Sequence, residues 1–162
     1  MDGNIGFWKC CSTFLTSLLR LRKLAGRWAR WDGETPLNFS QDFTVLTTGQ
    51  QQEFLAALIK RSPLPPATLE ELDCLYNLAS SGNYYILVPF IRLGLKSRWE
   101  PSAEKALEIV RVQGTYEFTR QLYKDLYAWE DKRQLALDAF LHNKNKYMDV
   151  VVNGVMQDLH LD

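Results

Sequence analysis

The amino-acid sequence predicts an all-α fold of about eight helices. Apolar residues recur every three or four positions through most of the chain, the spacing that places them on one face of a helix. Prolines and glycines divide these periodic segments into short lengths, and no segment alternates convincingly like a half-buried strand. The 162 residues fit one domain, which can bury a hydrophobic core without disulfides or metals.

The first predicted helix runs from Ser12 to about Trp31, and Gly33 and Pro36 end it. Its apolar and cationic faces lie on opposite arcs of a helical wheel. The apolar face consists of Phe14, Leu18, Leu21, Leu24, Ala25, Trp28 and Trp31. The cationic face consists of Arg20, Lys23, Arg27 and Arg30.

A polar connection with a few apolar residues follows, and after it two further helices. Thr48 to Gln51 has the form of a capping box, so we expect the second helix to begin there. The prolines of residues 62–66 stop it, because proline has no amide donor and biases its predecessor away from helix. Gly82 and Asn83 end the third helix. The apolar anchors of the connection are Leu37, Phe39, Phe43 and Leu46, and those of the two helices are Phe54, Leu55, Leu58, Ile59, Leu69, Leu72 and Tyr76.

The second half of the chain continues the pattern. Pro89 lies inside a segment of helical spacing, where an interior proline costs about 3 kcal/mol, so we expect a kink or a late helix start. Pro101 suits a first helical position and Gly114 a C-terminal stop. A short terminal helix is expected behind Asp149. The apolar residues that share one face of each predicted helix here are Ile86, Phe90 and Leu93, then Ala103, Ala106, Leu107 and Val110, then Phe118, Leu122, Leu126 and Trp129, and finally Leu135, Ala139 and Phe140.

Successive helix pairs of about 30 to 40 residues with short connections favour an armadillo-like stacked helical solenoid. The chain holds 19 Lys and Arg against 19 Asp and Glu. This balance argues against nucleic-acid binding, since phosphate neutralisation needs a cationic excess. The charge is uneven, because residues 1–31 carry six basic residues against one acid, an excess of five.

Three cysteines, Cys10, Cys11 and Cys74, cannot all pair, and this usage is typical of a reduced, cytoplasmic protein. The N-terminal segment lacks the basic region and cleavage site of a signal peptide, and no apolar run is long enough to span a bilayer. A zinc site needs three or four ligands at workable spacing. His142 and His160 have no such partners in a recognisable motif, so we expect both to be exposed and the chain to hold no metal ligand, cofactor or catalytic residue.

Several segments resemble one known family in order and spacing. They are GRW at 26–28, KRSPLPP at 60–66, LYNL at 75–78, KSRW at 96–99, FTRQLYKDL at 118–126 and QDLHLD at 157–162. They resemble the C-terminal helical domain of the leukotriene A(4) hydrolase and aminopeptidase B family of zinc aminopeptidases. We expect residues 17–162 to form this domain, whereas residues 1–16 resemble nothing in the family and are unassigned.

The resemblance implies that the zinc and the catalytic residues belong to a separate catalytic domain, the partner of this one. It also implies that this domain forms one wall of a cleft for a peptide or lipid substrate, where an arginine and a lysine hold the substrate carboxylate. The family motif Gln-Gly-Arg-Met-Lys-Phe-Thr-Arg reads Gln113-Gly-Thr-Tyr-Glu-Phe-Thr-Arg120 here. Thr115 thus stands at the arginine position and Glu117 at the lysine position, and Arg111 or Arg120 is the candidate for compensation.

Two functions remain open at this point. The first is a structural, cleft-lining fragment of an aminopeptidase or epoxide hydrolase, inactive by itself. The second is a free-standing solenoid whose basic first helix binds a protein or membrane surface, with Trp28 and Trp31 near its apolar boundary. Ordinary packing of a first solenoid helix explains the same amphipathic pattern, so we do not expect membrane binding.

Overall fold

The computed structural model describes residues 18–35, 43 and 45–161. Every regular element within this part of the chain is helical, as the sequence predicts. A helix over 18–28 comes first. It is followed by α2 (Thr48–Ile59), α3 (Pro66–Tyr76), α4 (Tyr84–Lys96), α5 (Glu100–Val112), α6 (Tyr116–Ala128), α7 (Arg133–Asn143) and α8 (Asp149–Leu159), with 3-10 turns η2 (Glu130–Lys132) and η3 (Lys144–Lys146) on either side of α7.

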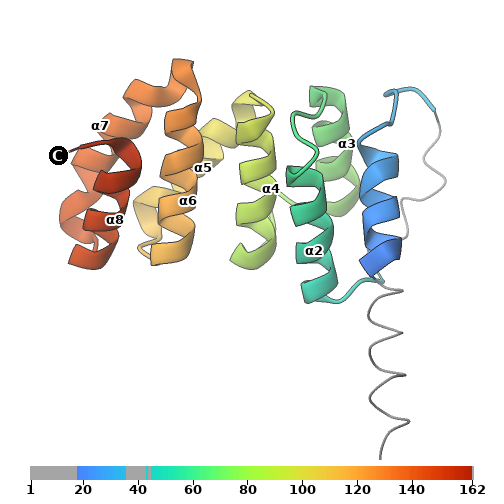
Figure 1. Ribbon diagram of the computed structural model, residues 1–162, viewed down its shortest axis with the longest axis horizontal. Helices are drawn as coiled ribbons and strands as arrows, with labels where there is room; N and C mark the ends of the chain where they lie inside the picture. The colour runs from blue at the N-terminus through green and yellow to red at the C-terminus, as the bar shows by residue number, and fades with distance from the viewer. Residues whose placement is uncertain (1–17, 36–42, 44, 162) are drawn as a thin grey trace, which may run out of the picture.

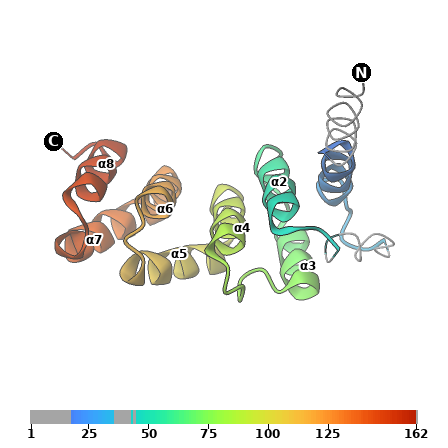
Figure 2. The same cartoon turned by 90° about the horizontal axis from the view of Figure 1, so that it is seen from below.

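The helices stack in two layers (Figure 2). Helix 18–28, α2, α4, α6 and α8 form one layer, and α3, α5 and α7 form the other. Within the first layer α2 packs on α4, α4 on α6, and α6 on α8. These helices run in the same direction, so their N-termini share one edge of the row (Figure 1). The arrangement is the stacked helical solenoid that the sequence predicts.

Helix 18–28 confirms the two predicted faces. Leu21, Leu24 and Trp28 are buried, and the cationic residues of the opposite face are exposed. Two details differ from the prediction, since the helix ends at residue 28 rather than near Trp31, and Trp28 is 0% exposed instead of lying at an apolar boundary. The Trp28 ring packs edge-on against Tyr76, with 5.8 Å between ring centroids. The apolar face of the helix is therefore part of the core. Residues 12–17 lie outside the described part of the chain.

The helix α2 begins at Thr48, but the predicted capping box is wrong by one residue. Thr47, not Thr48, caps the helix, because Gln50 stands three residues after Thr47 and can return the hydrogen bond. The Gln50 amide donates to the Thr47 hydroxyl at 3.4 Å, and the Thr47 amide donates to the Gln50 side chain at 3.0 Å. Behind this cap Phe54, Leu55 and Leu58 are buried as expected. In the preceding connection Phe43 is buried and Leu46 half-buried, whereas positions 37 and 39 are not described.

The predicted end of α3 and start of α4 also need correction. The third helix stops at Tyr76, well before Gly82, because Asn77 adopts the left-handed conformation with φ of 52°. Asn83 does not end α3 but caps α4, since its side chain accepts a hydrogen bond from the Tyr85 amide at 3.0 Å. The expected late start of α4 is wrong as well, because the helix begins at Tyr84 and continues through Pro89.

In the second half of the chain one predicted core residue is exposed. Leu135 is 46% exposed, whereas α7 buries Ala136, Phe140 and Asn143. One residue along a helix is a rotation of about 100°, so the choice of Ala136 as the inward position turns Leu135 outward. The predicted stripe of α6, from Phe118 to Trp129, is buried throughout. Among the described residues, no helix combines the length and apolar character needed to cross a membrane.

Candidate functional site

The corner between α5 and α6 contains Thr115, and the other predicted site positions lie on the two helices that it joins. Two hydroxyl groups fix the backbone of this corner. The Thr119 hydroxyl donates to the Gln113 carbonyl at 3.2 Å, and the Tyr147 hydroxyl donates to the Val110 carbonyl. Both carbonyls belong to the C-terminal end of α5, where the last carbonyl groups of a helix have no amide partner within it. The two hydroxyl groups supply hydrogen bonds in their place. The conformation of the corner is therefore set by residues of α6 and of the segment before α8.

The half-buried Tyr147 pairs with a second, fully buried phenol. Its oxygen lies 3.1 Å from that of Tyr123, a residue with no exposed surface. Burial raises the pKa of both hydroxyl groups above the ordinary tyrosine value. Both phenols therefore stay neutral at physiological pH, and their arrangement suits support of the corner rather than proton transfer.

Arg120 joins α6 to α8. Its guanidinium donates to both carboxylate oxygens of Asp158, at 2.7 and 3.0 Å, and also to the Tyr116 hydroxyl. Its charge lies over the Tyr116 ring, 5.1 Å from the centroid. The hydrogen bonds to Asp158 raise the pKa of Arg120, and the fork geometry makes the pair bidentate. Arg120 thus has a carboxylate partner within the chain.

Gly154 makes room for this pair. A Cβ atom at Gly154 would lie 2.8 Å from Cδ of Arg120 and 3.0 Å from the Tyr116 ring. Only glycine leaves the space that the Arg120 side chain occupies as it crosses α8. Sequence reasoning missed Gly154, Tyr116 and Asp158, although a glycine inside an apolar helical pattern was a signal of close packing.

Thr115 and Glu117 are both exposed at the N-terminal end of α6. Thr115 directly precedes the helix without capping it through its side chain, and its hydroxyl lies 3.5 Å from the Gln113 amide oxygen. Glu117 occupies the first turn, where the helix dipole favours a negative charge. Thr115, Glu117 and Arg120 therefore all lie at the N-terminal end of α6, within its cap and first two turns.

Arg111 lies apart from that group. It lines a groove of about 570 Å³ between α5 and α7, together with Asp138, His142 and Lys146. His142 and His160 are exposed, as the sequence predicts. Within the described ranges, no three His, Cys, Asp or Glu side chains lie close enough to hold a metal ion. The residues present there do not fit a zinc site.

A second ionic cluster, which sequence reasoning also missed, connects α4 to α6. Arg92 donates to Asp125 at 2.6 Å and to Gln121 at 2.8 Å, and Lys96 lies 3.4 Å from the other Asp125 oxygen. Asp125 is only 7% exposed, so its charge needs these cations. Gln121 and Asp125, the partners of Arg92, are 29 and 33 residues from it in sequence, a distance that no local pattern reveals. The cluster holds neighbouring helices of the first layer together.

Comparison with known proteins settles the family. Residues 46–159 match the family model described as "Leukotriene A4 hydrolase, C-terminal". The chain belongs to this family. It is 32% identical to leukotriene A-4 hydrolase of Xenopus laevis over 139 residues, which cover 85% of this chain and 23% of that protein. It is 27% identical to aminopeptidase B of Mus musculus over 114 residues, covering 69% of this chain and 18% of that enzyme.

A solved structure agrees with the family assignment. The structure of native yeast LTA4 hydrolase superposes with a TM-score of 0.76 at 20% sequence identity, covering 89% of this chain and 26% of that one. At this identity the likeness shows the fold. Leucine aminopeptidase 2 of Aspergillus terreus is 30% identical over 119 residues, which cover 73% of this chain and 19% of that protein. The chain thus spans less than a quarter of the length of the curated relatives it matches.

Proposed function

We propose that this chain is the C-terminal helical domain of a leukotriene A(4) hydrolase-like zinc aminopeptidase, and that it forms a structural wall of the substrate cleft without catalytic residues of its own. The match of residues 46–159 to the C-terminal family model carries the proposal. Relatives named as a hydrolase and as aminopeptidases support it, as does the small share of each that the chain covers. The partner in this proposal is a catalytic zinc domain, and the substrate is a peptide or lipid.

The proposed cleft wall lacks the two basic residues that, by the resemblance, hold a substrate carboxylate in other members of the family. Two exposed residues, Thr115 and Glu117, stand where that family has an arginine and a lysine. Each close pair of charges is worth about 4 kcal/mol at an effective dielectric constant of about 20, so Glu117 repels an anion where a lysine would attract it. Arg120 is engaged by Asp158, and Arg111 lines the α5–α7 groove. We infer a substrate whose end at this wall is not anionic.

The intact mass of the endogenous polypeptide tests the proposal most directly. We expect a species several times heavier than 18.8 kDa whose C-terminal peptides match this chain. The purified 162-residue chain should cleave no aminoacyl substrate, with or without added zinc. Turnover by this chain that a chelator abolishes would contradict the assignment of all catalytic residues to another domain. In a larger enzyme, the double substitution Thr115→Arg and Glu117→Lys should shift preference toward substrates with a free carboxylate.

A second candidate function is a free-standing solenoid that binds a protein or membrane surface. The exposed cationic residues of helix 18–28 favour it, and an endogenous species near 18.8 kDa would give it priority. The membrane version has less support, because the buried Trp28 is not available for an interface. Sedimentation with anionic liposomes that is insensitive to charge reversal at Arg20 and Lys23 would remove that version. For either candidate we propose a cytoplasmic location, which the unbridged, exposed Cys74 supports.

A further inference from the structure

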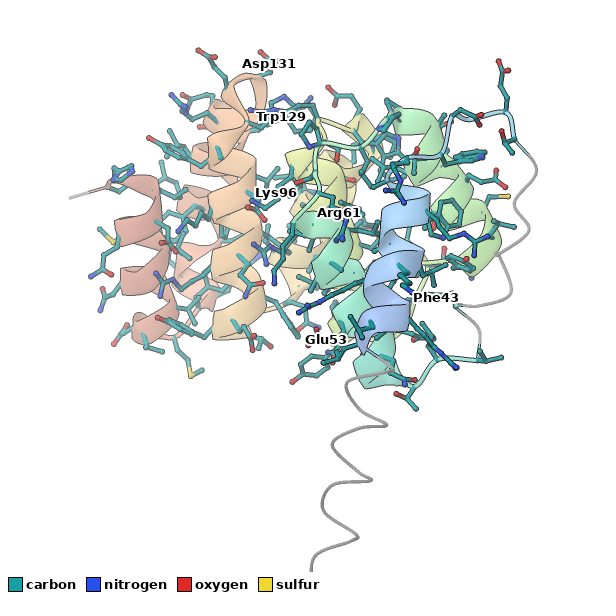
Figure 3. All side chains as sticks on the ribbon, turned by 45° about the vertical axis from the view of Figure 1, so that its right-hand side comes forward. Phe43, Glu53, Arg61, Lys96, Trp129 and Asp131 are labelled. Carbon is teal, nitrogen blue, oxygen red and sulfur yellow. The ribbon has the colours of Figure 1, made fainter. Side chains whose placement is uncertain are left out.

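One end of the helical row carries a hollow lined by basic side chains. The hollow has a volume of about 750 Å³ and lies on helix 18–28, and Arg61 reaches it from the end of α2 (Figure 3). Its cationic residues are Arg22, Lys23, Arg27, Arg30 and Arg61. None of the described residues that line it is acidic. Five positive charges therefore share one concave surface.

The sequence builds this hollow through helical spacing. Arg22 and Arg30 stand on one ridge with the small residue Gly26 between them, and Lys23 and Arg27 form the neighbouring ridge. Gly26 and Ala29 keep the floor low between the long side chains. The result is a depression with cations on its rim.

Arg61 is held in place from the neighbouring helix. Its guanidinium donates to the Ala57 carbonyl at 2.6 Å and reaches the Arg22 carbonyl at 3.5 Å. These bonds use backbone oxygens, so they orient the guanidinium without neutralising it. A fixed guanidinium fork is suited to a carboxylate, which it can bind through two parallel hydrogen bonds.

Three cations of this surface have no ion-pair partner among the described residues. Arg22, Lys23 and Arg30 form no ion pair within the described ranges, where the ion pairs lie on other helices. The acid of α2, Glu53, lines a neighbouring pocket together with Arg22 and Arg61, but no ion pair joins it to either arginine. Crowded like charges in a concave surface attract an anionic ligand.

The helix that carries the hollow has its apolar face in the core, which favours a polypeptide over a membrane as the source of that anion. The apolar face of the helix is buried through Leu21, Leu24 and Trp28, so it cannot insert among lipids. Leu19, 57% exposed beside the cations, offers one apolar contact of side-chain size.

We propose that this hollow is a docking site for an acidic segment of a partner polypeptide, with Asp or Glu carboxylates on its arginines and one apolar side chain against Leu19. This inference deepens the second candidate function, a protein-binding solenoid, and does not depend on the cleft-wall function. Binding should be measured on the 162-residue chain with a labelled peptide of glutamates around one leucine, and with its glutamine counterpart. We expect the glutamate peptide to bind at least about tenfold tighter, and to lose about tenfold in affinity between about 50 and about 500 mM salt, as screening weakens charge pairing.

Two variants with the same change in net charge test the location. Arg22→Gln, Lys23→Gln, Arg30→Gln and Arg61→Gln together should weaken the glutamate peptide about tenfold or more. The matched control combines Lys124→Gln, Arg133→Gln, Lys144→Gln and Lys146→Gln, all exposed on other helices, and should change affinity less than about twofold. Equal weakening by the two sets would overturn the proposal, because it would mean that only overall charge matters.

A third variant covers the case in which the quadruple substitution unfolds the chain. Leu19→Glu changes an exposed residue at the hollow and should also weaken the peptide, whereas unchanged affinity would contradict docking there. Vesicles containing phosphatidylserine supply the competing source of anions. If they bind tighter than the peptide and lose binding with the hollow variant, the ligand is a lipid surface and the polypeptide proposal fails.

Discussion

Gly154 is the residue that allows Arg120 to cross from α6 to α8. An alanine there places Cβ 2.8 Å from an arginine side chain that Asp158 holds by two hydrogen bonds. Such overpacking costs about 1 to 3 kcal/mol, against a gain of up to about 1 kcal/mol from replacing a helical glycine. We expect Gly154→Ala to lower the free energy of unfolding by about 1 kcal/mol in urea denaturation.

The control for this prediction is Gly49→Ala in the first turn of α2. A Cβ atom at Gly49 would meet nothing within 4 Å, so this substitution should stabilise the chain by about 0.5 to 1 kcal/mol. The two changes are the same in chemistry and opposite in expected sign. If both stabilise the chain, the close approach of Arg120 to α8 is not what Gly154 provides.

Asp32 gives a prediction for pH dependence. Hydrogen bonds from the Thr35 hydroxyl at 2.5 Å, and then from the Thr35 and Glu34 amides, lower the pKa of the Asp32 carboxyl from 3.8 to about 2. A carboxyl group with a lowered folded-state pKa contributes stability above its unfolded pKa and loses it as pH falls toward the folded one. This contribution is therefore lost between about pH 4 and about pH 2.

A carboxyl titration of Asp32 followed by NMR checks this prediction. Thr35→Ala removes the largest cause of the shift and should move the titration of Asp32 back toward 3.8. An unchanged titration in that variant would mean that the turn after helix 18–28 does not hold Asp32 in this way.

The positions of candidate site residues within one sequence motif were predictable. The residues that contact them from a distant part of the chain were not. Thr115, Glu117 and Arg120 follow from one short segment of sequence. Asp158 is 38 residues from Arg120, and its role depends on how α8 docks on α6. The prediction that Leu135 is a core residue is wrong. A helix that turns Ala139 and Phe140 inward can place either Leu135 or Ala136 on the same face, and the structure buries Ala136.

At the scale of elements, α4 and α5 approach closely at Gly94 and Ser102. A Cβ atom at Gly94 would lie 1.7 Å from Oγ and 2.7 Å from Cβ of the fully buried Ser102. Gly94→Ala should therefore reduce the free energy of unfolding by about 3 kcal/mol, as the helices separate or shift. Adding Ser102→Gly removes the clashing atoms and should recover part of that loss.

A double-mutant cycle in chemical denaturation measures this coupling. We expect a coupling energy of about 1 to 3 kcal/mol between Gly94→Ala and Ser102→Gly. Ser102→Ala alone is the control, since its buried hydroxyl has no hydrogen-bond partner and its loss should cost little. Additive effects of the two substitutions would contradict a direct contact at the crossing.

Helix existence was easier to predict than helix ends. Apolar periodicity identified every described helix, because each buries one face against the row. The ends depended on competing local signals, such as two adjacent threonines before α2 and an asparagine that ends α3 before any glycine. Pro89 was tolerated within α4, a helix that buries eight of its 13 residues, so packing outweighs the lost backbone hydrogen bond.

For the whole molecule, a row of helices predicts stability that varies along the row. The central helix α4 contacts α2, α5 and α6, whereas α8 lies at one end against α6. Because each element of a solenoid depends on its neighbours, we expect the slowest amide exchange in α4 and faster exchange in helix 18–28 and α8. Hydrogen–deuterium exchange with mass spectrometry measures this. Equal protection in all helices would show that the row unfolds only as a unit.

The solenoid class and the family were accessible from sequence, whereas the basic hollow was only partly so. The cationic face of the first helix is visible in its spacing, but Arg61 is 39 residues from Arg22 and joins it only through the packing of α2. The same packing buries Trp28, which decides between a core helix and an interfacial one. Tertiary contacts therefore supplied what periodicity left open.

The cationic end of the row also bears on how copies of this chain meet. Helix 18–28 is the last described helix on this side of the row, and a polar outer face keeps the end of a helical repeat soluble. Arg22, Lys23 and Arg30 place positive charge on this face, so two such faces repel each other. The arginine-rich face thus acts against end-to-end pairing through these surfaces.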